Sequence, residues 1–424
     1  MNAYSAETKK PFTTADTFFL LLCAVVMVCL CACDNGGKGD KPATTSTIAP
    51  ASTTTTMPPP PGTTTTTAAR NPGTGLTGPA FEVEPGIRID YAGNAKGGYN
   101  DDPSLGRVGT YVYHEDKSHD PETGEGGGSP GSRYAFSEDG ITFEDAVTVE
   151  MVAGVCSDNS NATYYFAHPE RLELPDGSGW RMYFLTFRRD EASGIPLFTG
   201  LMSSFSTDGI YFCSEEGSRY GLGPNDENTM GVYTTFVAEH ADEPQVVLLY
   251  LGDLAGNNNA RRAVAGADGY TFTWERDNVL NDATGRASDA YVDISTVPTG
   301  EPGKRRLYGM QGGTAIYSFI TDDDARTFTM EEGPRISADD FDIAVTEGRH
   351  VCNLYDPSLV QYRDENGDIT MTRMYVTGNV WDETLSWESD GQSGSCKDVE
   401  ACAGDVKYDG CYLMEALFSA VSYD

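Results

Sequence analysis

A heptad that ends in an aromatic residue recurs along this chain and constrains its fold more than any other feature. Residues 137–143 read Ser-Glu-Asp-Gly-Ile-Thr-Phe, and residues 206–212 read Ser-Thr-Asp-Gly-Ile-Tyr-Phe. Looser copies occupy residues 267–272 and 321–328, so neighbouring copies lie about 55–70 residues apart. Each copy follows a short apolar run that is typical of a strand. A structural unit that repeats at this spacing predicts an architecture of repeated sheets.

The chemistry of the heptad is that of a tight turn. The Asp-Gly pair supplies the positive φ that a hairpin needs, and the Asp carboxylate accepts backbone N–H groups within the turn. The aromatic residue at the end is expected to be buried between neighbouring sheets. Short antiparallel sheets joined in this way indicate an all-β fold, a β-propeller. The heptads resemble the Asp box of sialidases and other propeller glycosidases, which implies that Asp139 and Asp208 have a structural role and do not contact a substrate.

The charge of the chain excludes some partners. Its 424 residues carry a formal net charge of −35, whereas phosphate binding requires a basic surface, so we expect no nucleic-acid partner. Acidic loops leave a structural Ca²⁺ as an alternative, and residues 364–368 resemble a calcium loop. These residues lack a distal Glu at the right spacing, so a hairpin turn is favoured. We predict no cofactor and no other metal site.

The N-terminal region has the pattern of an export signal. Lys9 and Lys10 precede an apolar run over residues 18–30, and residues 30–33 read Leu-Cys-Ala-Cys. These last four residues resemble a bacterial lipobox, which implies cleavage before Cys33 and lipidation of its thiol. The sequence thus predicts a lipoprotein signal peptide over 1–33, with a retained membrane anchor as the alternative. Either way, the rest is expected in the bacterial cell envelope, membrane-anchored and facing outside the cytoplasm.

The remaining chain divides into a tether and a folded domain. Residues 34–78 are rich in Thr, Pro and Gly, a composition that cannot bury enough apolar surface to fold. We predict a disordered tether over 34–78 and a propeller domain over 79–424. This domain holds six cysteines, an even number that favours disulfides in an exported protein without fixing their pairing: Cys156, Cys213, Cys352, Cys396, Cys402 and Cys411.

Pairs of predicted strands ahead of the turns define about five blades. The first strands of these pairs open at Asp102, His168, Tyr233, Asp293 and Asp356. The last unit ends in an apolar strand in place of an Asp-Gly turn. We expect that strand to close the ring against a strand that starts near Phe81.

Several motifs together resemble one superfamily. Residues 102–104 and 356–358 both read Asp-Pro-Ser, residues 176–183 read Asp-Gly-Ser-Gly-Trp-Arg-Met-Tyr, and the heptads are similar to the Asp box of sialidases and other propeller glycosidases. Over residues 81–424 the chain resembles the five-bladed propeller glycosidases, which include arabinanases, xylosidases, invertases and levansucrases. The resemblance implies that carboxylates at the openings of the inner strands act on carbohydrate, an oligo- or polysaccharide, in a central funnel.

This resemblance also implies roles for individual residues. Asp102 matches the general base of the first blade. His168 and Tyr233 occupy the second and third positions, where the family has carboxylates, and Glu170 or Asp293 is then the candidate acid. The predicted catalytic residues are Asp102, Glu170, Asp293 and Asp356, and the predicted substrate-binding residues are His168, Arg171, Tyr165 and Tyr233.

Two other functions stay open. The missing carboxylates favour a catalytically degenerate propeller that binds glycan or protein, with a wet channel at its axis. A sialidase-like exo-glycosidase with six blades would need three arginines to hold a carboxylate, for which Arg88, Arg171 and Arg349 are available. In each case we expect a monomer.

Overall fold

The computed structural model describes residues 76–423, except for residues 102, 104–106, 118–131, 149–165, 190–195, 208, 210–211, 221–229, 240, 253–259, 277–278, 282–290, 390 and 404–405. The predicted signal peptide, Cys33 and most of the predicted tether lie outside these residues. Residues Gly75–Asp424 form one compact unit. Within the described part of the chain, no helix is long and apolar enough to cross a membrane.

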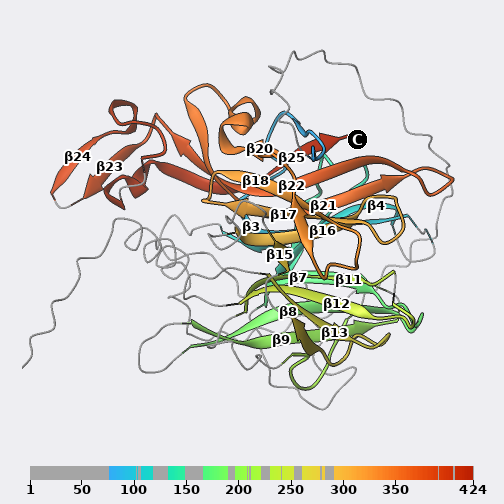
Figure 1. Ribbon diagram of the computed structural model, residues 1–424. Coiled ribbons are helices and arrows are strands. Elements are labelled where there is room, and N and C mark those ends of the chain that lie inside the picture. Colours follow the sequence, from blue (N-terminus) through green and yellow to red (C-terminus); the bar gives the residue numbers. More distant parts are fainter. Residues whose placement is uncertain are drawn as a thin grey trace, which may run out of the picture. The chain divides into compact units, whose positions relative to one another are not determined.

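Most described elements are strands, and they form successive sheets in chain order (Figure 1). The first sheet contains β3 (Ala92–Asn100), β4 (Gly109–Asp116), β5 (Ser132–Ser137) and β6 (Val147–Thr148). The second contains β7 (Phe166–Glu173), β8 (Trp180–Arg189), β9 (Pro196–Ser206) and β10 (Cys213–Ser214). The third contains β11 (Met230–Val237), β12 (Val246–Gly252), β13 (Ala260–Ala265) and β14 (Thr273–Arg276). The fourth contains β15 (Leu280–Asn281), β16 (Tyr291–Pro298), β17 (Arg305–Gln311), β18 (Ala315–Thr321), β19 (Phe328–Met330) and β20 (Ile336–Ser337).

The fifth sheet joins the two ends of the domain. Its strands β21 (Arg349–Arg363), β22 (Ile369–Asp382) and β25 (Tyr412–Ser422) are completed by β1 (Glu82–Val83) and β2 (Ile89–Asp90). Glu82 pairs with Val421, so the N-terminal strand lies against the C-terminal one, as predicted. The described residues therefore form a five-bladed β-propeller that closes on itself, and the six-bladed alternative is wrong.

The hydrophobic core is distributed between the blades. One cluster joins the fourth and fifth sheets through Tyr308, Leu354 and Phe418, together with Phe341 of the 3₁₀-helix η2 (Ala338–Ala344). Similar clusters join the third sheet to the fourth and the second to the third. Because each sheet buries apolar side chains against both of its neighbours, the blades hold one another in a ring.

The repeated turns behave as the heptad predicts. Oδ1 of Asp139 accepts the amide protons of Ile141 and Thr142 at 2.8 and 2.7 Å. The same turn docks on blade five, where the hydroxyl of Tyr375 donates to the carbonyl oxygen of Gly140 at 2.6 Å. Phe143 packs edge-on against Tyr375, with ring centroids 5.8 Å apart. Asp208 lies outside the described residues. Asp139 thus has the structural role that the sequence predicts.

The structure shows a second repeated motif, which the sequence analysis did not identify. The pattern Glu-x-Gly-x-Arg occurs at residues 84–88, 215–219 and 331–335, at the outer edges of blades five, two and four. In each copy the Glu forms a two-point contact with an arginine of the second strand; these arginines are Arg373, Arg181 and Arg306. The central Gly has a φ between 74° and 87°, a left-handed conformation that favours glycine. The motif therefore fixes the outermost strand of three blades.

An insertion between β22 and β25 carries two disulfides. It contains the hairpin of β23 (Ser386–Ser389) and β24 (Gln392–Ser395) and the 3₁₀-helices η3 (Cys396–Asp398) and η4 (Val406–Cys411) (Figure 1). Cys352 is bonded to Cys402, and Cys396 is bonded to Cys411. Cys213 is also disulfide-bonded. Cys156 lies outside the described residues. The prediction of disulfides in the domain is confirmed for the described cysteines.

Residues 364–368 form the turn between β21 and β22. The carbonyl oxygen of Asp364 accepts the amide proton of Gly367, and Oδ1 of Asp364 accepts those of Asn366 and Asp368. The Asp364 carboxylate thus accepts hydrogen bonds from its own turn, which agrees with the predicted hairpin at residues 364–368.

Candidate functional site

The inner strands are β3, β7, β11, β16 and β21, and each carries a β-bulge at an equivalent position; β21 has two further irregularities. The residues at these β-bulges, from blade one to blade five, are Asn94, His168, Gly231, Asp293 and Asp356. The four non-glycine residues have φ values of 50°–55°. For an L-residue this left-handed conformation costs about 1–2 kcal/mol, and bulges that hold such strain are frequent next to active sites. The bulges define five equivalent positions around the propeller axis.

The register predicted for the first blade is wrong. Asp102 was expected to open its inner strand, but that strand is β3, which ends at Asn100. Asn94 occupies the equivalent position. The prediction failed because β3 is rich in Gly and Ala and has no β-branched residue, so it lacks the composition of a strand. Asp102 itself lies outside the described residues, and its role as a base stays a prediction.

The prediction for the third blade also needs correction. The bulge of β11 falls at Gly231, two residues before Tyr233. Tyr233 is fully buried, and its hydroxyl donates to the backbone carbonyl oxygen of His168. Tyr233 therefore supports the His168 bulge from the core and does not face a substrate.

The bulges bring His168, Asp293 and Asp356 together. Nδ1 of His168 lies 3.5 Å from Oδ1 of Asp356, and the amide N–H of Asp356 donates to Oδ2 of Asp293 at 3.4 Å. His168 and Asp356 are 7% and 3% exposed. They belong to blades two and five, which are not neighbours in a ring of five. Their contact therefore crosses the central channel.

Burial sets the protonation of this cluster. It lowers the pKa of His168 to about 4, so the imidazole is neutral at pH 7 and its contact with Asp356 is not an ion pair. Burial raises the pKa of Asp356 well above its ordinary value, and the neighbouring Asp293 raises it further. Burial also raises the pKa of Asp293. Two carboxyl groups in this situation share one proton, because both cannot ionise so close together.

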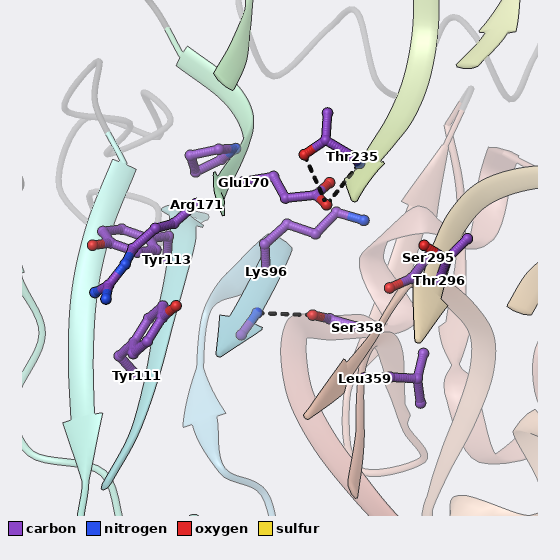
Figure 2. Close-up of a pocket in the computed structure, with 12 residues that line it drawn as sticks. Lys96, Tyr111, Tyr113, Glu170, Arg171, Thr235, Ser295, Thr296, Ser358 and Leu359 are labelled. Atoms are coloured by element: carbon purple, nitrogen blue, oxygen red, sulfur yellow. Dashed lines mark hydrogen bonds between the residues drawn. The ribbon is translucent and has the colours of Figure 1, made fainter. Parts of the chain in front are cut away.

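A polar cavity of about 170 Å³ lies next to this cluster, further along the inner strands (Figure 2). Every inner strand contributes to its wall, with Lys96, Glu170, Thr235, Ser295 and Ser358. An ammonium, a carboxyl and three hydroxyl groups provide both hydrogen-bond donors and acceptors. This lining suits a ligand rich in hydroxyl groups.

Glu170 is the carboxyl group of this cavity. Its Oε1 accepts the amide proton of Thr235 at 2.8 Å and the hydroxyl protons of Thr234 and Thr235 at 3.1 and 3.3 Å. Among the residues that the structure describes, its buried Oε2 has no hydrogen-bond partner. Burial raises the pKa of Glu170, and the Lys96 ammonium and the three donors act in the opposite direction. Glu170 thus has one anchored oxygen and one oxygen available to a ligand.

Arg171 and two tyrosines form another wall. The Arg171 guanidinium lies over the ring of Tyr111 at 5.0 Å, and both residues line the cavity with Tyr113 (Figure 2). Nη1 of Arg171 donates to the carbonyl oxygen of Gly209 at 3.1 Å. The structure thus places the predicted binding residue Arg171 at the cavity. Tyr165 lies outside the described residues.

Lys96 is a site residue that the sequence analysis missed. Its side chain is 4% exposed, and its Nζ donates to the carbonyl oxygen of Ile294 at 3.1 Å, which connects blade one to blade four. When the bulges are matched, Asn94-Ala95-Lys96 is aligned with His168-Pro169-Glu170, so Lys96 has the position on blade one that Glu170 has on blade two. The sequence analysis missed this correspondence because it placed the first inner strand at Asp102.

The three arginines of the sialidase alternative have separate roles. Nε of Arg88 donates to the hydroxyl of Ser419 at the outer edge of blade five, and Nε of Arg349 donates to Asp382. Of the three, only Arg171 lines the cavity. These contacts do not form the carboxylate clamp that a sialidase site requires.

Comparisons with known proteins find relatives through structure alone. No protein-family model and no curated protein matches the sequence. A family 117 glycoside hydrolase from Zobellia galactanivorans matches with a TM-score of 0.50 and 10% identity, over 82% of this chain and 92% of that one. An N-acetylgalactosamine deacetylase from F. plautii matches with a TM-score of 0.48 and 12% identity, over 82% and 96%. A GH62 alpha-L-arabinofuranosidase from Coprinopsis cinerea matches with a TM-score of 0.47 and 12% identity, over 82% and 96%. The match with the family 117 glycoside hydrolase agrees with the five-bladed propeller fold described above.

Proposed function

We propose that this protein is a carbohydrate-active propeller of the glycoside hydrolase type, with its site at the central channel. The observation that carries the proposal is the placement of two separate carboxyl centres at the axis. Glu170 comes from blade two, and the Asp293–Asp356 pair comes from blades four and five. In a ring of five, the boundary between blades four and five lies opposite blade two. Glycoside hydrolysis needs carboxyl groups on two sides of the scissile bond.

The environments of the two centres suggest different roles. The Asp293–Asp356 pair holds a proton, because burial and mutual proximity raise the pKa of Asp356. This suits Asp356 as the general acid. Glu170 is the candidate base: burial raises its pKa, which makes it a stronger base, while the Lys96 ammonium and three donors oppose this shift. Lys96, Ser295 and Ser358 would hold sugar hydroxyls, and the ring of Tyr111 offers an apolar face.

Glu170→Gln tests the hydrolase proposal. The purified full chain would be screened on aryl glycosides and on polysaccharides. Removal of a general acid–base group is expected to lower kcat/KM about 10²- to 10⁴-fold. Glu301→Gln, at an exposed pair with Lys304, is the matched control and should retain parental rates. Turnover that is unchanged in Glu170→Gln would contradict the assignment.

A second candidate is a non-catalytic binder of glycan. The contact of His168 with Asp356 favours it, because a separation of 3.5 Å leaves no room for a sugar ring between these two side chains. In addition, the bulges of blades one and three carry Asn94 and Gly231 in place of carboxylates. This candidate predicts no turnover of any glycoside, together with glycan binding that Glu170→Gln weakens.

We also propose that the protein is exported and anchored by a lipid on Cys33. The proposal is supported by the basic residues, the apolar run and the Leu-Cys-Ala-Cys sequence at residues 30–33. Cys33→Ala is expected to move the protein from the membrane fraction to the soluble fraction after expression in a bacterial host. Cys23→Ala is the control, because that cysteine lies within the apolar run. Unaltered partitioning of Cys33→Ala would refute the anchor.

A further inference from the structure

Lys96 is unusual for its position in this protein. The chain has 29 basic and 64 acidic residues, yet this cation lies buried at the axis. Buried ammonium groups are costly and are retained where they are paired or where they serve a function. The hydrogen bond from its Nζ to the Ile294 carbonyl oxygen does not neutralise its charge.

The Lys96 charge acts on ionisable groups of three other blades. Figure 2 shows its side chain extending beneath Glu170 into the cavity. These groups are His168 and Glu170 on β7, Asp293 on β16 and Asp356 on β21. Glu115 on β4, Lys117 just after β4 and Arg305 on β17 act on members of this cluster, and Glu415 on β25 acts on Lys117. Lys117 forms an ion pair with Glu115, in which Nζ of Lys117 lies 2.9 Å from Oε2 of Glu115. Lys96 is thus the cation that Glu170 and the aspartate pair share.

We propose that Lys96 is a positioning residue of the candidate active site, whose charge holds Glu170 and the Asp293–Asp356 pair in their working protonation states. The catalytic part of this inference rests on the proposed function. The geometry gives Lys96 one backbone acceptor on blade four, at the residue that follows Asp293, and places its side chain in the wall of the same cavity as Glu170. The pKa values agree with this arrangement, since the Lys96 charge lowers those of Glu170, Asp293 and Asp356.

Lys96→Gln separates the charge from the hydrogen bond. The Gln amide still provides a donor for the Ile294 carbonyl oxygen but has no charge. Without the ammonium, the three carboxyl groups are harder to ionise in the folded state than before. The unfolding midpoint of the variant should therefore match the parent near pH 4 and fall progressively below it as the pH rises to about 8.

Three further variants keep the test decisive. Lys96→Arg keeps the charge and should retain the parental pH profile. In Lys96→Gln/Glu170→Gln one of the carboxyl groups is also neutral, so the loss at high pH should be smaller than in Lys96→Gln. Lys304→Gln, at the surface pair with Glu301, should show no such pH dependence. If the unfolding midpoint of Lys96→Gln is lowered by the same amount at every pH, the proposal is overturned. A lowered unfolding midpoint in Lys96→Arg would also overturn it.

The stability profile does not depend on turnover, so it separates this inference from the proposed function. If the profile changes as expected while no glycoside is cleaved, the electrostatic role stands and the hydrolase proposal fails. If glycosides are cleaved, the acidic limb of the kcat/KM profile should move up by about 1–3 pH units in Lys96→Gln. If the acidic limb of the kcat/KM profile stays at the parental pH, Lys96 has no positioning role in the reaction.

Discussion

Replacement of Arg373 by leucine is expected to lower the free energy of unfolding by about 3–5 kcal/mol, the usual cost of leaving one member of a buried ion pair alone. Nε and Nη2 of Arg373 donate to Glu84 at 2.8 and 2.9 Å, and both side chains are mostly buried. Nη1 donates to the carbonyl oxygen of Asp139 in the turn of blade one. Arg373 thus joins the N-terminal strand, blade five and blade one where the ring closes.

Urea unfolding followed by circular dichroism would measure this loss. The matched control is Arg107→Leu, because Arg107 forms an equally direct two-point contact with Glu144, at 2.6 and 2.7 Å. Those side chains are 51% and 58% exposed, so solvent screening should make the change much smaller. Equal losses in the two variants would show that burial of the Arg373 pair is not the cause. Arg181→Leu would show whether the effect belongs to the repeated motif or to ring closure.

Asp356→Asn is expected to abolish turnover and to stabilise the fold at neutral pH. Loss of the general acid should lower kcat/KM about 10²- to 10⁴-fold. The stability gain follows from burial, which together with Asp293 raises the pKa of Asp356 in the folded state. Removal of this group should therefore raise the free energy of unfolding at pH 7. The backbone also permits the change, since Asn tolerates the φ of 51° at this position.

The sign of the pH dependence gives a specific test. A carboxyl group with a raised folded-state pKa stabilises the fold fully below its unfolded pKa, near pH 4, and loses that contribution as the pH rises through the folded value. Parent and Asp356→Asn should thus have similar stability near pH 4 and diverge towards pH 7, with the variant more stable. Asp242→Asn, at an exposed loop position, is the control and should follow the parent. A variant that is less stable than the parent at pH 7 would contradict the buried, proton-sharing pair.

Much of the fold could be predicted from the sequence because the relevant physics is local. Asp-Gly turns are determined by φ preferences and by the reach of one carboxylate, so residues 137–143 mark a hairpin without tertiary information. The five units, the closing strand near Phe81 and the hairpin at residues 364–368 followed from the same rules. The Glu-x-Gly-x-Arg motif was present in the sequence too, but its Glu forms its contact with an arginine of another strand.

The candidate site was only partly predictable. His168, Glu170, Asp293 and Asp356 were identified because each stands at or beside the start of a recognisable inner strand. Lys96 was missed because its strand, β3, lacks strand-forming residues and is held in place by its neighbours.

The sequence by itself predicted about five blades, the turns between strands and several carboxyl groups near an axis. Only the tertiary structure decided which residues face one another there. The reason is the β-bulge, a slip of the register whose position depends on how the inner strands pack around the ring. One such slip places Asn94 and Lys96 at the axis of blade one, and another directs Asp356 across the channel to His168.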